Sequence, residues 1–327
     1  IFITYLNKKN YLLDKNFRKP QAFHTEATPL AGGILIILVF SFSNFYFYND
    51  ILQLKLLFFG LTYFLIGFLD DIGLIRSPKK RLIILIIISL ILIESFNFLI
   101  FNTGYDLLDR FFQKPLISLI FTTFCILFII NGSNFVDGFN GLLGIHMFSI
   151  SLILFLINYF NQSEALSFYI LILSTSIFLF LLFNFPRGKV FLGDSGSYLL
   201  GALISIFSIE TSKANPNISP IFFAVILYYL FYEVFFSYVR KFIYEKKSAF
   251  YPDKKHLHMI LYRRLNYGLN ETKKSNYLTA LITNIFYLIT VFPVFFVYYS
   301  SFYCMLYFFC CLLFYSCFYL ILNKYES

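Results

Sequence analysis

Four short polar segments interrupt an otherwise apolar chain, and each carries side chains that can bind phosphate or a metal ion. The central one, residues 131–141 (NGSNFVDGFNG), spaces Asn131, Asn134 and Asp137 three residues apart, so a helix would carry all three on one face. The alternative is a helix cap followed by a polar hairpin, since Asn and Asp favour helix ends and glycine permits turns. Because capping explains one polar side chain and not three, we favour a functional site.

Two adjacent carboxylates, Asp70 and Asp71, end an apolar run in the segment FLDDIGLIRSPKKRL. A carboxylate at mid-bilayer costs about 2.5–3.5 kcal/mol on insertion scales, so we expect the pair near the interface or in a wet cavity. Two adjacent anions also repel each other unless a cation lies beside them. Taken alone, the pair is more typical of a solvated helix end than of a site.

The segment FNFPRGKVFLGDSGSYLLG contributes Asn184, Lys189 and Asp194. Gly193 and Gly196 would expose backbone amides around the carboxylate, and such amides at a helix start attract phosphate. The alternative is a tight turn between helices in which Asp194 is the N-cap.

The fourth segment, DKKHLHMILYRRL, places His256 two residues before His258. A zinc site would need further Cys or His ligands, and only His24 and His146 remain elsewhere. The surrounding cations favour anion binding instead; the alternative is a basic amphipathic stretch that lies on an anionic leaflet. These cations are Lys254, Lys255, Arg263 and Arg264.

The composition identifies the elements that must position these segments. The 327 residues are 59% hydrophobic, 22% aromatic and 13% charged, with a mean hydropathy of +0.74, whereas soluble domains are about 25% charged. Long apolar runs without alternation predict an all-α, polytopic membrane protein. The five cysteines lie inside these runs without metal spacing, so no disulfide framework is expected.

The apolar runs predict ten membrane-spanning helices, and residues 1–6 resemble the end of an eleventh, truncated one. We treat residues 1–327 as a single transmembrane catalytic domain with a histidine-containing loop at 245–275. The expected spans are 30–48, 52–69, 82–101, 116–131, 139–159, 165–185, 196–212, 219–241, 277–298 and 302–322.

The distribution of Lys and Arg predicts the orientation of the chain. All but four of the 26 basic residues fall in alternate loops, and such loops are cytoplasmic in membrane proteins. This orientation places all four polar segments on the cytoplasmic side, and it explains the net charge of +9 without a nucleic acid. The four exceptions are Lys55, Arg110, Lys114 and Lys213.

Taken together, the four segments resemble those of the polyprenyl-phosphate N-acetylhexosamine-1-phosphate transferases over essentially the whole chain. The matching elements, in order, are the DD pair, NxxNxxDGxxGL, FxGDxGS and the histidine loop. That superfamily includes the enzymes that start the synthesis of peptidoglycan lipid I, enterobacterial common antigen, O-antigen and teichoic-acid linkage units. The loop departs from the HxHH of many relatives at Met259, which argues against the lipid I enzyme. The spacing in DDIGLIRSPKKRL is also more similar to that of the O-antigen and teichoic-acid branch.

The resemblance implies transfer of a sugar 1-phosphate from a UDP-N-acetylhexosamine to a polyprenyl phosphate, with release of UMP, at the cytoplasmic face of a bacterial inner membrane. It also implies Mg²⁺, with Mn²⁺ as a substitute. We expect direct attack on the β-phosphate, with Asp70 orienting or deprotonating the lipid phosphate. The predicted catalytic residues are Asp70, Asp71, Asp137 and Asp194, with Asp194 and Asp71 as metal ligands; the predicted substrate-binding residues are Asn131, Asn134, Asn184, Lys189, His256, His258, Arg263 and Lys19.

Two other classes of protein fit the same features. Carboxylates within broken membrane helices also mark transporters of anionic solutes, although no inverted repeat is visible and the acidic groups gather on one face. The second is a membrane interaction protein without catalysis. The sequence is also compatible with a homodimer.

Overall fold

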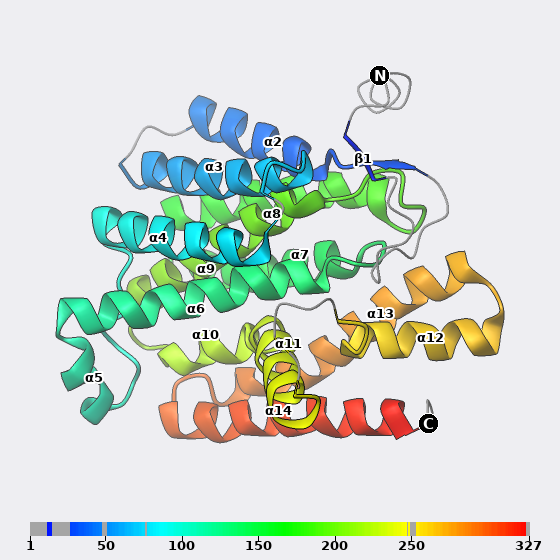
Figure 1. The fold of residues 1–327 in the computed structure, drawn as a ribbon. Helices are drawn as coiled ribbons and strands as arrows, with labels where there is room; N and C mark the ends of the chain where they lie inside the picture. The colour runs from blue at the N-terminus through cyan, green and yellow to red at the C-terminus, as the bar shows by residue number, and fades with distance from the viewer. Residues whose placement is uncertain are drawn as a thin grey trace.

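The computed structural model describes residues 12–14, 27–47, 51–75, 77–246, 248 and 253–324. The predicted Lys19 and the expected partial span at residues 1–6 lie outside the described residues. Helices dominate the described part of the chain (Figure 1), which confirms the all-α prediction. The two short strands, β1 (Leu13–Asp14) and β2 (Thr28–Pro29), pair with each other in antiparallel register.

Helices occupy all ten apolar runs, with two helices in the run 219–241, and in the described part of the chain two further helices lie between runs. The helices are α2 (Gly32–Phe47), α3 (Ile51–Asp71), α4 (Pro78–Phe96), α5 (Asp106–Phe112), α6 (Pro115–Val136), α7 (Leu142–Phe160), α8 (Glu164–Asn184), α9 (Gly193–Ala214), α10 (Pro220–Ile226), α11 (Tyr228–Val239), α12 (Leu257–Leu269), α13 (Thr272–Val291) and α14 (Ser301–Lys324). A π-helical turn, Arg240–Tyr244, extends α11, and a 3-10 turn, Phe292–Phe296, extends α13.

Six helices in the described part of the chain are long and apolar enough to cross a membrane: α3, α6, α7, α8, α13 with its 3-10 turn, and α14. The chain is therefore a multi-pass membrane protein. The run 219–241 holds no straight helix, because α10 and α11 are bent by 68° against each other; the pair forms either a broken span or a re-entrant loop. Two helices that cover other expected spans extend beyond them into charged residues: α4 begins with three cations, and α9 carries Asp194 and Lys213 at its ends and Glu210 within the expected span.

Helix α9 forms the centre of the bundle and is buried along most of its length. Small residues on its neighbours allow close helix packing, as is common in membranes. A Cβ added at Gly33 of α2 would lie 2.5 Å from the Gly196 nitrogen, and one added at Gly67 of α3 would clash with the carbonyl of Asp194. These contacts fix the start of α9 against α2 and α3.

Replacing Gly67 by Ala is expected to destabilise this contact, because the obstacle is backbone rather than a flexible side chain. Overpacking of this kind costs about 1–3 kcal/mol, so the thermal unfolding midpoint of the purified protein should fall. Gly268→Ala in α12 is the matched control, since an added Cβ there meets nothing within 4 Å. Equal unfolding midpoints for the two variants would contradict the packing described here.

The polar segments meet at one end of the bundle. Helices α3, α6 and α8 end there, and α4, α7 and α9 begin there, at the same end as the turn between α12 and α13 (Figure 1).

Candidate active site

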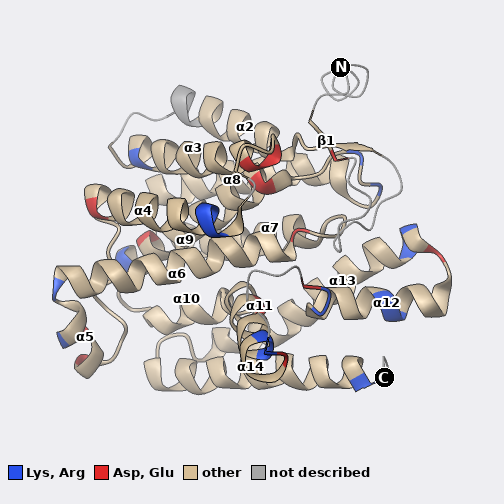
Figure 2. Ribbon diagram, viewed as in Figure 1, with Lys and Arg blue, Asp and Glu red and all other residues tan. Residues whose placement is uncertain are grey.

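Three carboxylates from two helices form an acidic cluster at this end (Figure 2). Asp70 and Asp71 close α3, and Asp194 lies in the first turn of α9. The Asp71 carboxylate accepts hydrogen bonds from the backbone amides of Asp194 (2.8 Å) and Ser195 (3.0 Å). Asp71 therefore caps the start of α9 from a different helix.

This cap corrects two expectations about the GDSGS segment. Asp194 is not the N-cap, because Asp71 takes that role, and the amides of Asp194 and Ser195 hold Asp71 instead of a phosphate. Gly193 makes the approach feasible: its φ is +75°, and an added Cβ would lie 2.7 Å from Asp71 Oδ2. The side chain of Asp194 is thereby left for other partners.

Arg81 of α4 supplies the cation that the adjacent aspartates require. Its guanidinium forms an ion pair with Asp70, lies 3.7 Å from Asp194 Oδ2 and stands 6.0 Å from the ring centre of Tyr198. In the sequence it looked like one of several basic residues that orient the chain. Two carboxylates, those of Asp70 and Asp194, thus face this one guanidinium, while Asp71 is held by backbone amides.

Asn134 joins the central segment to the acidic cluster. Its amide donates to Asp194 Oδ1 and, at 3.3 Å, to Ser197 Oγ. The expected hairpin over residues 131–141 is wrong in its first half, because α6 continues to Val136. Asn131 does not join the cluster through a described hydrogen bond; its amide donates to the Leu127 carbonyl, one turn back in its own helix.

Asp137 follows the last residue of α6 and is half-buried. Burial, and then the negative charge of Asp71, raise the pKa of this carboxyl to about 7. A group with a pKa near neutrality can both take and give a proton. This pKa makes Asp137 a candidate proton acceptor near Asp71.

The histidine loop reaches the central segment through aromatic contacts. The ring centre of His256 lies 5.1 Å from that of Phe135, and the ring of His258 lies 5.8 Å from that of Phe139. Both imidazoles are buried, although we expected them to be accessible to a phosphate. Met259 is also buried, so the departure from HxHH falls in the core and not in the polar face.

The remaining predicted substrate-binding cations are less engaged. Lys189 is exposed and lines a cavity of about 300 Å³ at the end of α8 together with Arg187 and Phe183. Arg263 is half-buried and donates to the Lys254 carbonyl at 2.6 Å. The structure therefore leaves their role as substrate ligands a prediction.

Asn184 has a structural role that the sequence did not reveal. Its side-chain oxygen accepts from the Gly141 amide (2.6 Å), and its nitrogen donates to the Val190 carbonyl (2.7 Å). It thereby ties the turn before α7 to the loop before α9.

Replacing Asn184 by Ala is expected to lower the free energy of unfolding by about 1–3 kcal/mol, because two buried backbone groups lose their partner. Thermal or denaturant unfolding measures this loss. Asn161→Ala is the control, since in the described part of the chain that exposed side chain bonds only within its own turn, to the Ile157 carbonyl. A variant at Asn184 as stable as the one at Asn161 would refute this role.

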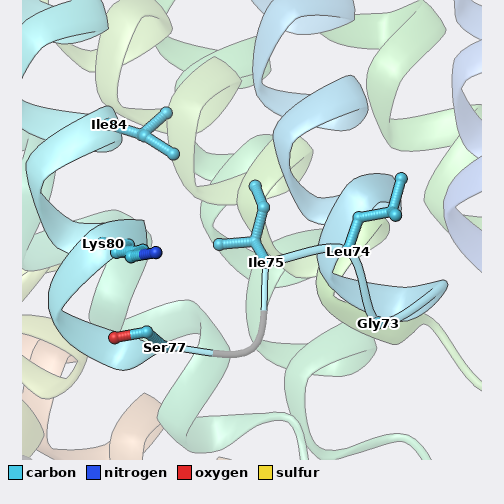
Figure 3. Close-up of a pocket in the computed structure, with 6 residues that line it drawn as sticks. All are labelled: Gly73, Leu74, Ile75, Ser77, Lys80 and Ile84. Atoms are coloured by element: carbon cyan, nitrogen blue, oxygen red, sulfur yellow. The ribbon is translucent and has the colours of Figure 1, made fainter.

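A second cavity, of about 460 Å³, opens beside the acidic cluster between the end of α3 and the start of α4. Lys80 and Ile84 project from α4 toward Ile75 of the connecting loop (Figure 3). Leu74, Gly73 and Ser77 complete its lining. The cavity is mainly apolar, with one cation.

The acidic cluster fits Mg²⁺ if the substrates provide part of the coordination. No three His, Cys, Asp or Glu side chains converge on a metal position in the described part of the chain. Mg²⁺, however, is commonly held by one or two carboxylates plus substrate phosphates. Asp194 and Asp70 offer oxygens free of backbone amides, whereas those of Asp71 are engaged. A magnesium site thus stays a prediction, with Asp194 and Asp70 as its candidate ligands.

Comparison with known proteins tests the family resemblance. The model of glycosyl transferase family 4 matches residues 53–212. An undecaprenyl-phosphate alpha-N-acetylglucosaminyl 1-phosphate transferase of Thermotoga maritima is 31% identical over 262 residues, which are 79% of this chain and 75% of the relative. The chain belongs to glycosyl transferase family 4.

Other members of glycosyl transferase family 4 show similar agreement. The enzyme of the same name from Escherichia coli O157:H7 is 29% identical over 274 residues, covering 80% of this chain and 72% of its own. A phospho-N-acetylmuramoyl-pentapeptide-transferase of Bacillus pumilus is 30% identical over 229 residues, covering 64% and 70%. The resemblance drawn from the motifs is confirmed. The segment that matches the family model includes the acidic cluster, Arg81 and Asn134, and ends before the histidine loop.

Proposed function

We propose that this protein transfers N-acetylhexosamine 1-phosphate from a UDP-sugar to a polyprenyl phosphate such as undecaprenyl phosphate, releasing UMP. The acidic cluster of Asp70, Asp71 and Asp194 around Arg81, at one end of a membrane bundle, is the observation that carries this proposal. A site at the end of membrane helices can receive a lipid phosphate from the bilayer and a nucleotide from water. The names of the Thermotoga and Escherichia relatives support the same acceptor and make N-acetylglucosamine the first sugar to test.

In the proposed reaction, an oxygen of the lipid phosphate attacks the β-phosphorus of the UDP-sugar. The bond between this phosphorus and the bridging oxygen breaks, and the electron pair leaves with UMP. A phosphate monoester has a second pKa near 6, so the attacking group is largely dianionic at neutral pH. The proton that remains on a minority of acceptors can pass to Asp137, whose raised pKa suits that transfer.

Mg²⁺, when bound, would neutralise charge that develops on the diphosphate. Asp194 and Asp70 would hold it, and Asn134 orients the Asp194 carboxylate through its hydrogen bond. Asp71 acts one step removed, because it fixes the backbone from which Asp194 projects. Arg81 is placed to pair with a phosphate oxygen from its position between Asp70 and Asp194.

We further propose that the site faces the cytoplasm. The end of the bundle that holds the acidic cluster also carries the cations at the start of α4 and along α12 (Figure 2). At the opposite end, Lys55 and Lys213 donate to the carbonyls of Phe96 and Asn97. The charge asymmetry that orients membrane proteins thus supports the cytoplasmic assignment.

The proposal is tested with purified protein in detergent, polyprenyl phosphate, Mg²⁺ and a panel of UDP-N-acetylhexosamines. We expect UMP release that requires both substrates and the metal. A transporter of anionic solutes would release no UMP in detergent, yet would accumulate a UDP-sugar inside sealed proteoliposomes. That second pattern would overturn the proposed function.

A further inference from the structure

A buried carboxylate that the sequence did not bring to notice lies beneath the histidine loop. Glu233 of α11 is 1% exposed. Its Oε2 lies 2.9 Å from His256 Nδ1, and its Oε1 lies 3.4 Å from His258 Nδ1. The two imidazole planes are nearly parallel, with an angle of 2° between them and 5.5 Å between their centres. One carboxylate thus faces both imidazoles of the loop.

The charge of Glu233 must be balanced within this network. A buried ionised carboxylate is costly unless it is paired with a cation and hydrogen-bonded. Its other described polar contacts, with the Tyr229 hydroxyl at 3.2 Å and with Tyr315, are to neutral groups. The imidazoles are therefore the nearest groups that can carry the compensating charge.

The two other carboxylates beside the loop, Asp253 and Glu245, already lie next to cations. Asp253 pairs with Arg240, accepts from Ser237 and lies 3.8 Å from both Lys241 and His256 Nε2. Glu245 pairs with Arg240 at 2.8 Å and with Lys255 at 3.0 Å. The groups facing the imidazoles from the other packed elements are the aromatic rings of Phe135 and Phe139.

We propose that Glu233 is a positioning residue that holds the His256–His258 pair as a fixed, singly protonated unit against the central segment. His256 is the better proton carrier, since it lies between Glu233 and Asp253, whereas His258 faces only Glu233. The unit presses its rings on Phe135 and Phe139, which flank Asp137. Glu233 thereby joins α11, the histidine loop and the end of α6 into one wall of the site.

The protonation is tested by nitrogen NMR of the full chain in detergent, with ¹⁵N-labelled histidine. The chain has only four histidines, so the signals can be assigned by single substitutions. At neutral pH we expect one imidazolium among them, and we expect Glu233→Gln, which keeps the shape but removes the charge, to convert it to neutral imidazole. Glu210→Gln, at an ion pair with Lys213 away from the loop, should leave the spectrum unchanged. An unchanged spectrum in Glu233→Gln would overturn the proposal.

A second variant covers the case in which Glu233→Gln does not fold. In His258→Gln, His256 is the one imidazole left opposite Glu233, so it should give the imidazolium signal. Neutral imidazole at His256 in this variant would equally overturn the proposal.

The positioning role has a kinetic consequence that rests on the proposed function. If the loop binds the donor in both ground and transition states, Glu233→Gln should raise KM for the UDP-sugar about tenfold and change kcat by less than about twofold. An unchanged KM would remove this role. The NMR result does not depend on turnover. A wild-type protein that releases no UMP would therefore refute the proposed function, and the NMR spectra would still test the protonation of the histidine pair.

Discussion

Replacing Asp194 by Asn is expected to lower kcat by about a thousandfold. The substitution keeps the size of the side chain and an oxygen that can accept from Asn134, but it removes a charge from the acidic cluster. Metal-assisted charge stabilisation is worth several kcal/mol, and about 4 kcal/mol corresponds to about a thousandfold in rate. Steady-state release of UMP at saturating substrates measures the loss.

The matched control for this variant is Asp106→Asn in α5. Asp106 is an exposed aspartate at the start of that short helix, away from the acidic cluster. It should retain wild-type turnover. If Asp194→Asn turned over at a rate close to that of the control, Asp194 would not hold the metal, and the assignment of the cluster would be wrong.

Replacing Arg81 by Gln is expected to have opposite effects on turnover and on metal binding. The guanidinium neutralises part of the acidic cluster and is placed to pair with a phosphate, so its loss should lower kcat about a hundredfold, as removal of one electrostatic contact to a transition state does. The same loss leaves Asp70 and Asp194 more negative. A unit charge at about 4 Å contributes at most about 4 kcal/mol near a protein surface, and partial exposure of Arg81 reduces this. We therefore expect Mg²⁺ to half-saturate the variant at about a tenth of the wild-type concentration.

Magnesium titration of turnover measures both effects in one experiment. Arg110→Gln is the control, because this exposed arginine lies in α5. It should change neither kcat nor the magnesium requirement. Two results would show that Arg81 does not act between the carboxylates and the substrate. One is half-saturation at a lower Mg²⁺ concentration with unchanged kcat; the other is a lower kcat with half-saturation at a higher Mg²⁺ concentration.

The hydrophobic pattern predicted the helices well, because a membrane helix requires a long apolar run that few other structures share. It did not predict the break between α10 and α11, since neither Pro nor Gly marks Leu227. It also placed the end of α6 five residues early. The polar side chains in this stretch continue the helix because each has a hydrogen-bond partner: Asn134 donates to Asp194 of α9, and Ser133 donates to the Ile129 carbonyl one turn back in α6.

The sequence predicted which residues belong to the site but not which of them contact each other. Local spacing singled out Asp70, Asp71 and Asp194, yet only the packing of α3 on α9 reveals that Asp71 caps Asp194. The sequence indicated that the aspartates need a cation beside them, but it presented Arg81 only as one of the basic residues that orient the chain. Glu233 is a single acidic residue within an aromatic run, YYLFYEVFF, so no local motif drew attention to it. Its importance comes from histidines more than twenty residues later in the chain.

The central claim is that the sugar travels together with one phosphate, and a doubly labelled donor tests it most directly. The donor is a UDP-N-acetylhexosamine with radioactive phosphorus in the β-phosphate and a second isotope in the sugar, supplied with polyprenyl phosphate and Mg²⁺. The account predicts that both labels enter the lipid product in equal amounts while unlabelled UMP is released. Sugar label in the lipid with labelled UDP in solution, or no label in the lipid with any sugar of the panel, would contradict it.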